Sequence, residues 1–414
     1  MITTINNKHN KLNVPNLRFK EFEGEWKEST IGEMFDLYSG NTPSRLNKEH
    51  FKGTVNWISS GELKEHYIYS SKEQISEEAA KSLKLLPVGT FVIAIYGLEA
   101  EGVRGTGSIT QEPSTISQAC MSFIPKGVIE NEFLYSWYKK HGNVIGIRYA
   151  QGTKQQNLSY DILEKFRIAY PNTKEQEKLN KFISLLDERI ATQSKIIDKL
   201  QTLIKGMEDN LLDNPLWEKT YLRSFMQFFP TNSLSWEQLS YKEGAIRNLH
   251  YGLIHGLQTR GINSVSLPMI KNEAIPKQYT LCQVGDVAFA DASEDTGEIA
   301  KSVEFVDTIE GDTICGLHTI HGRDIKNRTV VGFKGFAFNS RYFHNQIKRL
   351  AQGTKVFSIT ANNLSSCYVY LPDLETQKAI VNLLKTYEAK LLVSKRLLEH
   401  YEKQKQYLLR QMFI

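Results

Sequence analysis

Apolar residues recur in alternating steps of four and three along two long segments of the chain. The seam of the first segment consists of Leu179, Ile183, Leu186, Ile190, Gln193, Ile197, Leu200, Ile204, Met207 and Leu211. The same spacing, 201 positions later, gives Ile380, Leu384, Tyr387, Leu391, Ser394, Leu398, Tyr401, Lys405, Leu408 and Met412. A heptad seam of this length is typical of a coiled coil, since ordinary surface helices rarely extend over about 40 residues. We therefore predict two long helices that pack antiparallel.

Both seams are interrupted by a polar residue at the same place, Gln193 in the first and Ser394 in the second. Each lies near the middle of its predicted helix, and the middles of two antiparallel helices meet. We therefore predict that these two residues face each other and form a polar layer that favours one alignment of the helices.

A third apolar position accompanies each seam. It is occupied by Phe182, Ile196 and Leu203 in the first segment and by Leu383 and Leu397 in the second. A seam between two helices needs only two positions per heptad, so the third requires another explanation. Either the globular parts of the chain cover this stripe, or helices of a partner protein dock on it.

The helices belong to an internal repeat. Residues 148–154 read RYAQGTK and residues 349–355 read RLAQGTK, and the offset between them holds downstream without a gap. It pairs Leu163 with Leu364, Pro171 with Pro372, and Gln176 with Gln377. Upstream the similarity is weaker, which indicates that the joints are shared while the globular parts have diverged.

Each copy leads into its helix in the same way. An apolar run, Phe166–Tyr170 or Cys367–Leu371, predicts a strand, and the proline that follows ends its pairing. Asn172 and Asp373 then stand where an N-cap is expected, with Glu175 three residues later in the first copy, as in a capping box.

The repeat predicts an α+β chain of two pseudo-symmetric globular domains joined by two long helices that form an antiparallel coiled coil. The expected segments are a flexible N-terminus at 1–14, a first globular domain at 15–171, a first helix at 172–213, a second globular domain at 214–372 and a second helix at 373–414.

Composition narrows the class of protein. The chain has 414 residues, of which 41% are apolar, and this suffices for two or three domains with cores of their own. Its 51 basic and 46 acidic residues give a formal charge of +5, which permits nucleic-acid binding without indicating it. The sequence shows neither an apolar run of about 18 residues nor a signal peptide, and its four cysteines are scattered. We therefore expect a cytoplasmic protein with buried thiols.

Motifs that would indicate catalysis or a metal are weak. The glycine-rich segment 102–107 lacks the strand and helix of a cofactor loop and indicates a turn. Residues 214–217 (NPLW) lack the second proline of the Asn/Asp-Pro-Pro-aromatic motif of amino-methyltransferases and predict a helix stop. Cys315, His318 and His321 are spaced as possible ligands, but no fourth ligand stands at zinc-like spacing. We therefore expect no catalytic residue, no metal and no cofactor on this chain.

The order of domain, helix, domain and helix, with AQGTK before each joint and Pro-x-x-x-x-Gln at the start of each helix, resembles the specificity subunit of type I restriction–modification systems. The first domain adds Ser39–Ser44 (SGNTPS) and Trp57–Leu63 (WISSGEL), both typical of that family's target-recognition domains. The second domain lacks a Gly-x-Thr-Pro segment. It carries Asp291–Asp295 (DASED) and Gly316–Ile320 (GLHTI), which look like another variant of the same domain. The resemblance covers essentially the whole chain.

The resemblance implies a protein of host defence that binds double-stranded DNA and has no catalytic activity of its own. Each target-recognition domain would read one half of a split, asymmetric target. The helices would act as a spacer and as the dock for two methyltransferase subunits, which bind S-adenosylmethionine and methylate adenine. Two motor-nuclease subunits, which use ATP and Mg, would complete the restriction enzyme. Two other classes stay open: a coiled-coil scaffold that binds only protein, and a DNA methyltransferase or nuclease in its own right.

The repeat also separates candidate DNA contacts by kind. Residues identical in both copies carry no sequence information, so Lys154 and Lys355 are phosphate candidates, unless they are only solvated charge. Base-reading residues should differ between the copies, because the half-sites differ. In the first domain these candidates are Asn41, Thr42, Ser44, Arg45, Gln155 and Gln156. In the second domain they are Tyr251, His255, Thr259, Arg260 and Ser293. Glu294 and Asp295 would repel phosphate, and they either cap a turn or accept a hydrogen bond from cytosine.

Overall fold

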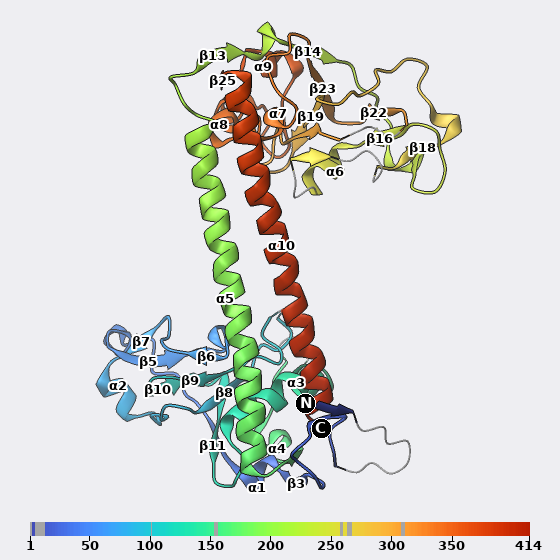
Figure 1. Ribbon diagram of the computed structural model, residues 1–414. Coiled ribbons are helices and arrows are strands. Elements are labelled where there is room, and N and C mark those ends of the chain that lie inside the picture. Colours follow the sequence, from blue (N-terminus) through green and yellow to red (C-terminus); the bar gives the residue numbers. More distant parts are fainter. Residues whose placement is uncertain are drawn as a thin grey trace. The chain divides into compact units, whose positions relative to one another are not determined.

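The computed structural model describes residues 2–4, 13–100, 102–152, 156–256, 260–262, 267–307 and 311–414 (Figure 1). The chain divides into two compact units. Unit 1 comprises Met1–Ser194 together with Arg396–Ile414, and unit 2 comprises Lys195–Lys395. Each unit therefore holds one globular domain and a part of each long helix.

Unit 1 is built on a five-stranded sheet of order β4-β11-β8-β9-β6, and it also contains a three-stranded sheet of order β10-β5-β7. Its strands are β1 (Ile2–Thr4), β2 (Leu17–Phe19), β3 (Lys27–Thr30), β4 (Phe35–Ser39), β5 (Val55–Ile58), β6 (Tyr67–Ile68), β7 (Gln74–Ile75), β8 (Phe91–Ala94), β9 (Gly107–Thr110), β10 (Ser114–Ile116), β11 (Cys120–Pro125) and β12 (Arg167–Tyr170). Its helices are α1 (Ile31–Met34), α2 (Glu77–Lys81), α3 (Asn131–Tyr149), α4 (Tyr160–Leu163) and part of α5 (Thr173–Leu211). The central strand β8 reads FVIA and is buried throughout, because α3 packs against the sheet there.

Unit 2 repeats this strand order with different residues. Its five-stranded sheet has the order β14-β23-β19-β21-β17, and a second sheet has the order β15-β18-β16-β22. The strands are β13 (Glu218–Tyr221), β14 (Met226–Phe229), β15 (Leu239–Ser240), β16 (Arg247–Leu249), β17 (Gly261–Ile262), β18 (Met269–Ile270), β19 (Val287–Ala290), β20 (Ala292–Ser293), β21 (Ser302–Phe305), β22 (Thr313–Cys315), β23 (Thr319–Asp324), β24 (Phe357–Ser358) and β25 (Tyr368–Leu371). The helices are α6 (Tyr251–Gly256), α7 (Phe333–Ala337), α8 (Arg341–Leu350), α9 (Ala361–Ser366) and part of α10 (Leu374–Met412). The prediction of an α+β chain with two related domains is confirmed.

The joints between domain and helix are the most closely repeated part of the fold. Strand β12 pairs antiparallel with β3, and β25 pairs antiparallel with β13. Just beyond each strand a buried glutamine closes the joint. The side-chain oxygen of Gln176 accepts from the amide of Glu130 at 3.0 Å, and that of Gln377 accepts from the amide of Val330 at 3.0 Å. Both side-chain amides donate to the carbonyl of the preceding proline. The Pro-x-x-x-x-Gln pattern therefore encodes three-way hydrogen bonding that fixes the start of each helix.

The predicted N-caps are confirmed, but the capping box is not. The side chain of Asn172 accepts from the amide of Glu175 at 3.0 Å, and that of Asp373 accepts from the amide of Thr376 at 2.9 Å. The Glu175 carboxylate, however, accepts from Arg18 at 2.7 and 2.8 Å instead of returning to the cap. A buried arginine needs a carboxylate partner more than an exposed cap amide does, and this explains the exchange.

Each long helix is continuous for 39 residues, with bounds within two residues of those expected. Every residue of both predicted seams is buried or half-buried. In unit 1 the start of α5 packs with the end of α10 in one core, through Ile183 and Leu408 among others. In unit 2 the end of α5 packs with the start of α10, through Leu211 and Leu384. In unit 1 Lys405 pairs with Asp187 and Arg189 lies over the ring of Tyr401, so positions on α10 fall as those on α5 rise. The helices therefore run antiparallel there, as predicted.

Three residues of the N-terminal segment for which flexibility was predicted lie in a strand. Ile2–Thr4 form β1, which pairs antiparallel with β2. The segment reads ITT, and β-branched residues favour a strand when a free sheet edge is close by.

Candidate nucleic-acid interface

In unit 1, four of the predicted base readers share the loop that follows β4. A Cβ at Gly40 would lie 2.1 Å from the carbonyl oxygen of Ile116, so only glycine allows the loop to lie this close to β10. The next residue, Asn41, donates its amide to that same carbonyl at 3.1 Å, and its own carbonyl accepts from Nε1 of Trp57 at 3.0 Å. Backbone groups thus fix the loop, while the side chains of Asn41 and Ser44 are exposed and that of Thr42 is half-buried.

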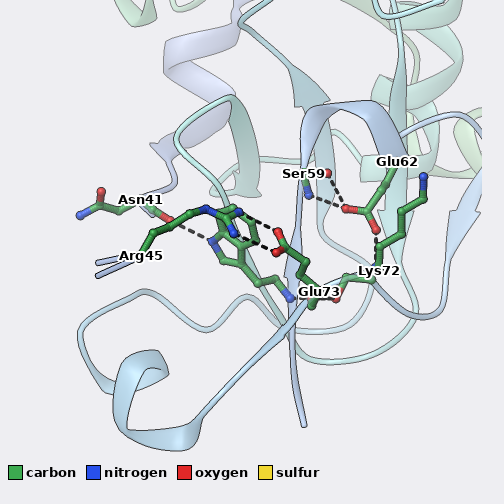
Figure 2. Close-up of polar contacts among 8 residues, drawn as sticks. Asn41, Arg45, Ser59, Glu62, Lys72 and Glu73 are labelled. Atoms are coloured by element: carbon green, nitrogen blue, oxygen red, sulfur yellow. Dashed lines mark hydrogen bonds and ion pairs between the residues drawn. The ribbon is translucent and has the colours of Figure 1, made fainter. Parts of the chain in front are cut away.

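The last of these four, Arg45, is held in place by its neighbours (Figure 2). Its guanidinium donates two hydrogen bonds to the Glu73 carboxylate, at 2.9 and 2.7 Å, and lies 4.4 Å from the ring centre of Phe51. The hydrogen bond with Arg45 lowers the pKa of Glu73, and the same bond raises the pKa of Arg45. Because the ion pair is exposed it contributes little stability, so a guanine or a phosphate can replace Glu73 at little cost.

The WISSGEL segment, which carries part of the family resemblance, is structural. The Glu62 carboxylate accepts from the amide and hydroxyl of Ser59 at 2.9 and 2.5 Å, and from the amide of Lys72 at 2.5 Å (Figure 2). Glu62 thereby ties two loops together. The Lys72 side chain is left exposed next to Glu73, although Lys72 is not among the predicted DNA contacts.

The remaining candidates of unit 1 lie near the repeated AQGTK turn. The amide of Gln156 donates to Glu99 at 2.7 Å, and its side-chain oxygen accepts from Arg104 at 3.1 Å. These contacts hold Gln156 against its own domain, so it is less suited to read a base. Lys154 and Gln155 lie outside the described residues.

Unit 2 has a counterpart of the Asn41 loop that sequence comparison missed. Asn232 follows β14 as Asn41 follows β4, and it donates to the carbonyl of Cys315 at 2.9 Å. Its side-chain oxygen accepts from Asn248 at 3.2 Å. The surrounding Gly-x-Thr-Pro segment of the first domain has no counterpart here, so only the position after the edge strand could have identified this residue.

Three predicted base readers of unit 2, Tyr251, His255 and Ser293, lie in one neighbourhood. The ring of Tyr251 contacts those of His255 and His318, with centroids 5.9 and 5.2 Å away. His255 lies 3.2 Å from the carbonyl of Ala292, directly before Ser293. Aromatic and imidazole groups at the edge of a domain can stack on bases and donate to them. The neighbouring Asp295 accepts from the amide of Gly297 at 2.7 Å, which favours the turn cap over contact with cytosine.

The Arg260 side chain contacts the two long helices, which is not the arrangement expected of a base reader. Its guanidinium donates to Glu208 on α5 and lies 3.6 Å from Glu388 on α10, while it packs 5.4 Å from the ring centre of Phe336. Two carboxylates on the helices attract the side chain more strongly than open solvent does, so the arginine anchors the domain instead. Thr259 lies outside the described residues.

The second phosphate candidate, Lys355, is exposed in the AQGTK turn of unit 2. Gln352 and Ser358 close this turn with two backbone hydrogen bonds of 3.0 and 2.8 Å, as Gln151 and Asn157 close the first turn. A Cβ at Gly353 would lie 1.9 Å from the carbonyl oxygen of Val356, which explains the glycine of the repeated motif. The turn therefore presents its lysine on a rigid support.

One group of described side chains has the chemistry of metal ligands. A ring nitrogen of His321 and the sulfur atoms of Cys282 and Cys315 all lie within 4.8 Å of one another. His318, which the sequence placed with them, instead lies 3.0 Å from Asp291 and is exposed. The cluster thus differs from the one that spacing suggested, because Cys282 is brought to it from 33 residues away.

Comparison with known proteins agrees with the resemblance. The specificity subunit of the EcoR124I/EcoR124II type I restriction enzyme of Escherichia coli is 31% identical over 200 residues, which cover 47% of this chain and 45% of that protein. The alignment thus spans less than half of that relative. The MjaVIII specificity subunit of Methanocaldococcus jannaschii is 23% identical over 415 residues and covers 94% of this chain and 93% of that protein.

A crystal structure of a type I restriction–modification S subunit from M. genitalium has the same fold, with a TM-score of 0.59 at 15% identity. The match covers 97% of this chain and 99% of that one. None of the helices in the described part of the chain combines the length and apolar character that a membrane span needs. The family model of the type I restriction modification DNA specificity domain matches residues 23–202 and 318–402, more than half of the chain. The protein therefore belongs to the family of type I restriction–modification DNA specificity proteins.

Proposed function

We propose that this chain is the non-catalytic DNA-reading subunit of a type I restriction–modification enzyme in the cytoplasm, and that each unit reads one half of a bipartite, asymmetric target in double-stranded DNA. One observation carries the proposal. Both units have the same strand order and the same joint, whereas the loop after β4 and the region around α6 present different side chains. Two equal frames with unequal loops suit two unequal half-sites held at a fixed spacing.

Within this proposal the residues divide into two kinds. The exposed loop of Asn41, Ser44 and Arg45 reads bases in the first half-site, and Tyr251 with its histidine neighbours reads bases in the second. Lys355 and the matching Lys154 contact phosphate, where a shared residue is sufficient because phosphate is the same in every sequence.

The exposed stripe on the long helices supports partner proteins. Phe182 packs against Phe19 at 5.8 Å between ring centres, but the other residues of the third apolar position are exposed. They are Ile196, Leu203, Leu383 and Leu397, and Leu185 is exposed as well. In unit 1 a groove of about 550 Å³, lined by Leu185, Arg189 and Tyr401 among others, lies against α5. So many exposed apolar side chains favour the docking of a partner protein over burial by the globular domains of this chain.

The occupants we propose are two methyltransferase subunits, which bind S-adenosylmethionine and methylate adenine. Two motor-nuclease subunits, which hold ATP and Mg, complete the enzyme. The task of this chain is to bring them to one sequence, and that task requires no catalytic group of its own.

The test is to sequence modified adenines in cells that carry this chain and its methyltransferase partner. The expected result is a single motif of two specified half-sites separated by a fixed run of unspecified bases. Replacing residues 216–370 by the same segment of a relative should then change one half-site and leave the other and the spacer unchanged. An ungapped motif, or an exchange that alters both half-sites, would contradict the proposal. Binding of S-adenosylmethionine by the isolated chain would instead support an enzyme.

A further inference from the structure

Three side chains with soft metal-ligand atoms converge inside unit 2. Cys315 is the last residue of β22, and His321 lies in β23. Cys282 follows Leu281, which forms an isolated β-bridge with Ile314 of β22. Their exposed fractions are only 2%, 1% and 7%. The sulfur atoms of Cys282 and Cys315 lie 3.6 Å apart, and a histidine ring nitrogen lies within 4.8 Å of both.

These separations fit a tetrahedral metal. Zinc binds thiolate sulfur at about 2.3 Å, so two sulfur atoms on one tetrahedral zinc are about 3.8 Å apart. The observed sulfur separation is within a few tenths of an ångström of that value. The histidine nitrogen needs to move inward by about 1 Å to reach its ligand distance of about 2.0–2.1 Å.

The surroundings of His321 support the same use. Its Nε2 atom lies 2.8 Å from Oδ2 of Asp286, and both side chains are almost completely buried. Asp286 in turn accepts from Arg323 at 2.7 and 2.8 Å and from the amide of Gln283 at 2.8 Å. A carboxylate that orients a ligating histidine is the usual second layer of a zinc site. The charges also balance, since two thiolates and Asp286 would offset one zinc ion and Arg323.

We propose that Cys282, Cys315 and His321 bind one zinc ion, with a solvent molecule in the fourth position. The ion joins β22 to β23 across the turn that carries His318, next to Tyr251 and its neighbours. It therefore stiffens the part of unit 2 that faces the candidate base readers. The role is structural, because the ligands come from the frame of the domain.

Unit 1 supplies an internal control for this site. At the matching positions of its sheets, Ile116 ends β10 as Cys315 ends β22, and Ser122 pairs with Val92 on β8 as His321 pairs with Ala288 on β19. Neither residue is a zinc ligand. The proposal therefore requires one zinc per chain and excludes two.

The experiment measures metal in the full chain, purified without chelator, by inductively coupled plasma mass spectrometry. We expect one zinc per chain. The variants Cys282→Ser and His321→Ala should lose most of it. The matched controls Cys120→Ser and Cys367→Ser, which remove buried thiols elsewhere, should keep it. Replacement of zinc by cobalt should give the absorption bands of thiolate-bound cobalt in the wild type, a readout that depends on no variant folding.

Three results would overturn the proposal. The first is a zinc-free wild-type chain that also takes up no cobalt into thiolate coordination. The second is a disulfide between Cys282 and Cys315, detected by mass spectrometry of peptides from chain alkylated before reduction. Zinc that remains at full stoichiometry in both site variants would place the metal elsewhere and reject this assignment as well.

Discussion

The two units anchor their domains to the long helices from the same backbone position, but with a histidine in one and an arginine in the other. His66 directly precedes β6, and Arg260 directly precedes β17, the matching edge strand. The carbonyl of His66 accepts from the amide of Ile109 at 2.8 Å, and that of Arg260 accepts from the amide of Glu304 at 2.9 Å. The backbones are therefore equivalent, and only the chemistry of the side chain differs.

In unit 1 the His66 ring is enclosed on every side. Nε2 lies 2.8 Å from Glu132, and Nδ1 lies 3.1 Å from Asp187 on α5. The ring stacks between Tyr67 and Tyr135, with centroids 4.1 and 3.9 Å away. Lys405 on α10 donates to Asp187, so the junction reaches both helices.

In unit 2 Arg260 makes the same connections with a permanent charge. Glu388 stands 201 positions after Asp187, and Phe336 stands 201 positions after Tyr135, so an acid and a ring are kept at equivalent places. Glu208 on α5 is the second carboxylate. Burial raises the pKa of Glu208 more than Arg260 lowers it, and burial likewise raises the pKa of Glu388.

One junction is thus built on a histidine, whose ordinary pKa lies close to neutrality, and the other on an arginine. Burial alone would lower the pKa of His66, but its contacts with Asp187 and Glu132 outweigh burial and raise it. An arginine stays charged throughout the physiological range. The repeat has thus kept the frame of the anchor while allowing its electrostatics to diverge.

The largest expected effect is that of Arg260→Ala. The change leaves Glu208 and Glu388 near each other without their shared cation, and the side chains are at most about a quarter exposed. Breaking such a pair should lower the free energy of unfolding of unit 2 by about 2–3 kcal/mol, less than for a fully buried pair. Urea denaturation, with hydrogen exchange to locate the loss in unit 2, measures this.

Arg45→Ala is the matched control, since its ion pair with Glu73 is exposed. It should leave stability unchanged but lower the sequence specificity at one base of a half-site. Arg260→Ala, in contrast, should leave the methylated sequence unchanged. If Arg260→Ala instead relaxes the target while stability holds, Arg260 reads bases and its role as an anchor is wrong.

The contrast between Arg45 and Arg260 also shows what could be predicted from the sequence. The joints and helices could be predicted because their residues repeat at a fixed offset and their heptads are regular. The side-chain direction of Arg260 could not, because an arginine beside a polar loop has the same pattern whether it faces DNA or a pair of carboxylates. The roles of Asn232 and Cys282 could not be predicted for a related reason. Strand pairing brings these residues to their sites, and pairing between distant strands leaves no local sequence signal.

The second prediction concerns pH. A raised histidine pKa means that the folded chain holds the proton more tightly than the unfolded chain. The stabilisation by His66 is therefore fully present below pH 6.5, its ordinary pKa, and is lost as the pH rises through the raised value. Hydrogen exchange of unit 1 peptides from pH 6 to pH 8 should show this loss in the wild type, whereas His66→Arg should remove it.

Two neighbours in unit 1 titrate with the opposite sign. Burial, reinforced by Lys405, lowers the pKa of Lys139 to about 8, and burial also lowers the pKa of His141. Each of these groups makes the folded chain more stable as the pH rises. Because both are present in the wild type and in His66→Arg, the difference between the two proteins isolates His66. An identical pH profile for both proteins would show that this junction carries no charge near neutrality.

The smallest expected effect on stability belongs to the polar layer. Gln193 is only 8% exposed, although its side chain is polar, and Ser394 is half-buried. Their equal heptad positions predict that they face each other. Replacing both by leucine should raise the free energy of unfolding by roughly 1 kcal/mol, because apolar area replaces polar groups in the seam. The same change should loosen the alignment that a polar layer enforces.

A slip by one heptad moves a helix by about 10 Å, which equals about three base pairs. The double leucine variant should therefore methylate the original target less, or spread to targets with other spacers, while both half-sites stay the same. Each single variant serves as a control, since one remaining polar residue still disfavours an apolar partner. Sequencing of modified adenines measures the spacer directly. If the double variant is more stable yet keeps one target and one spacer, the alignment is set by the joints and the polar layer is incidental.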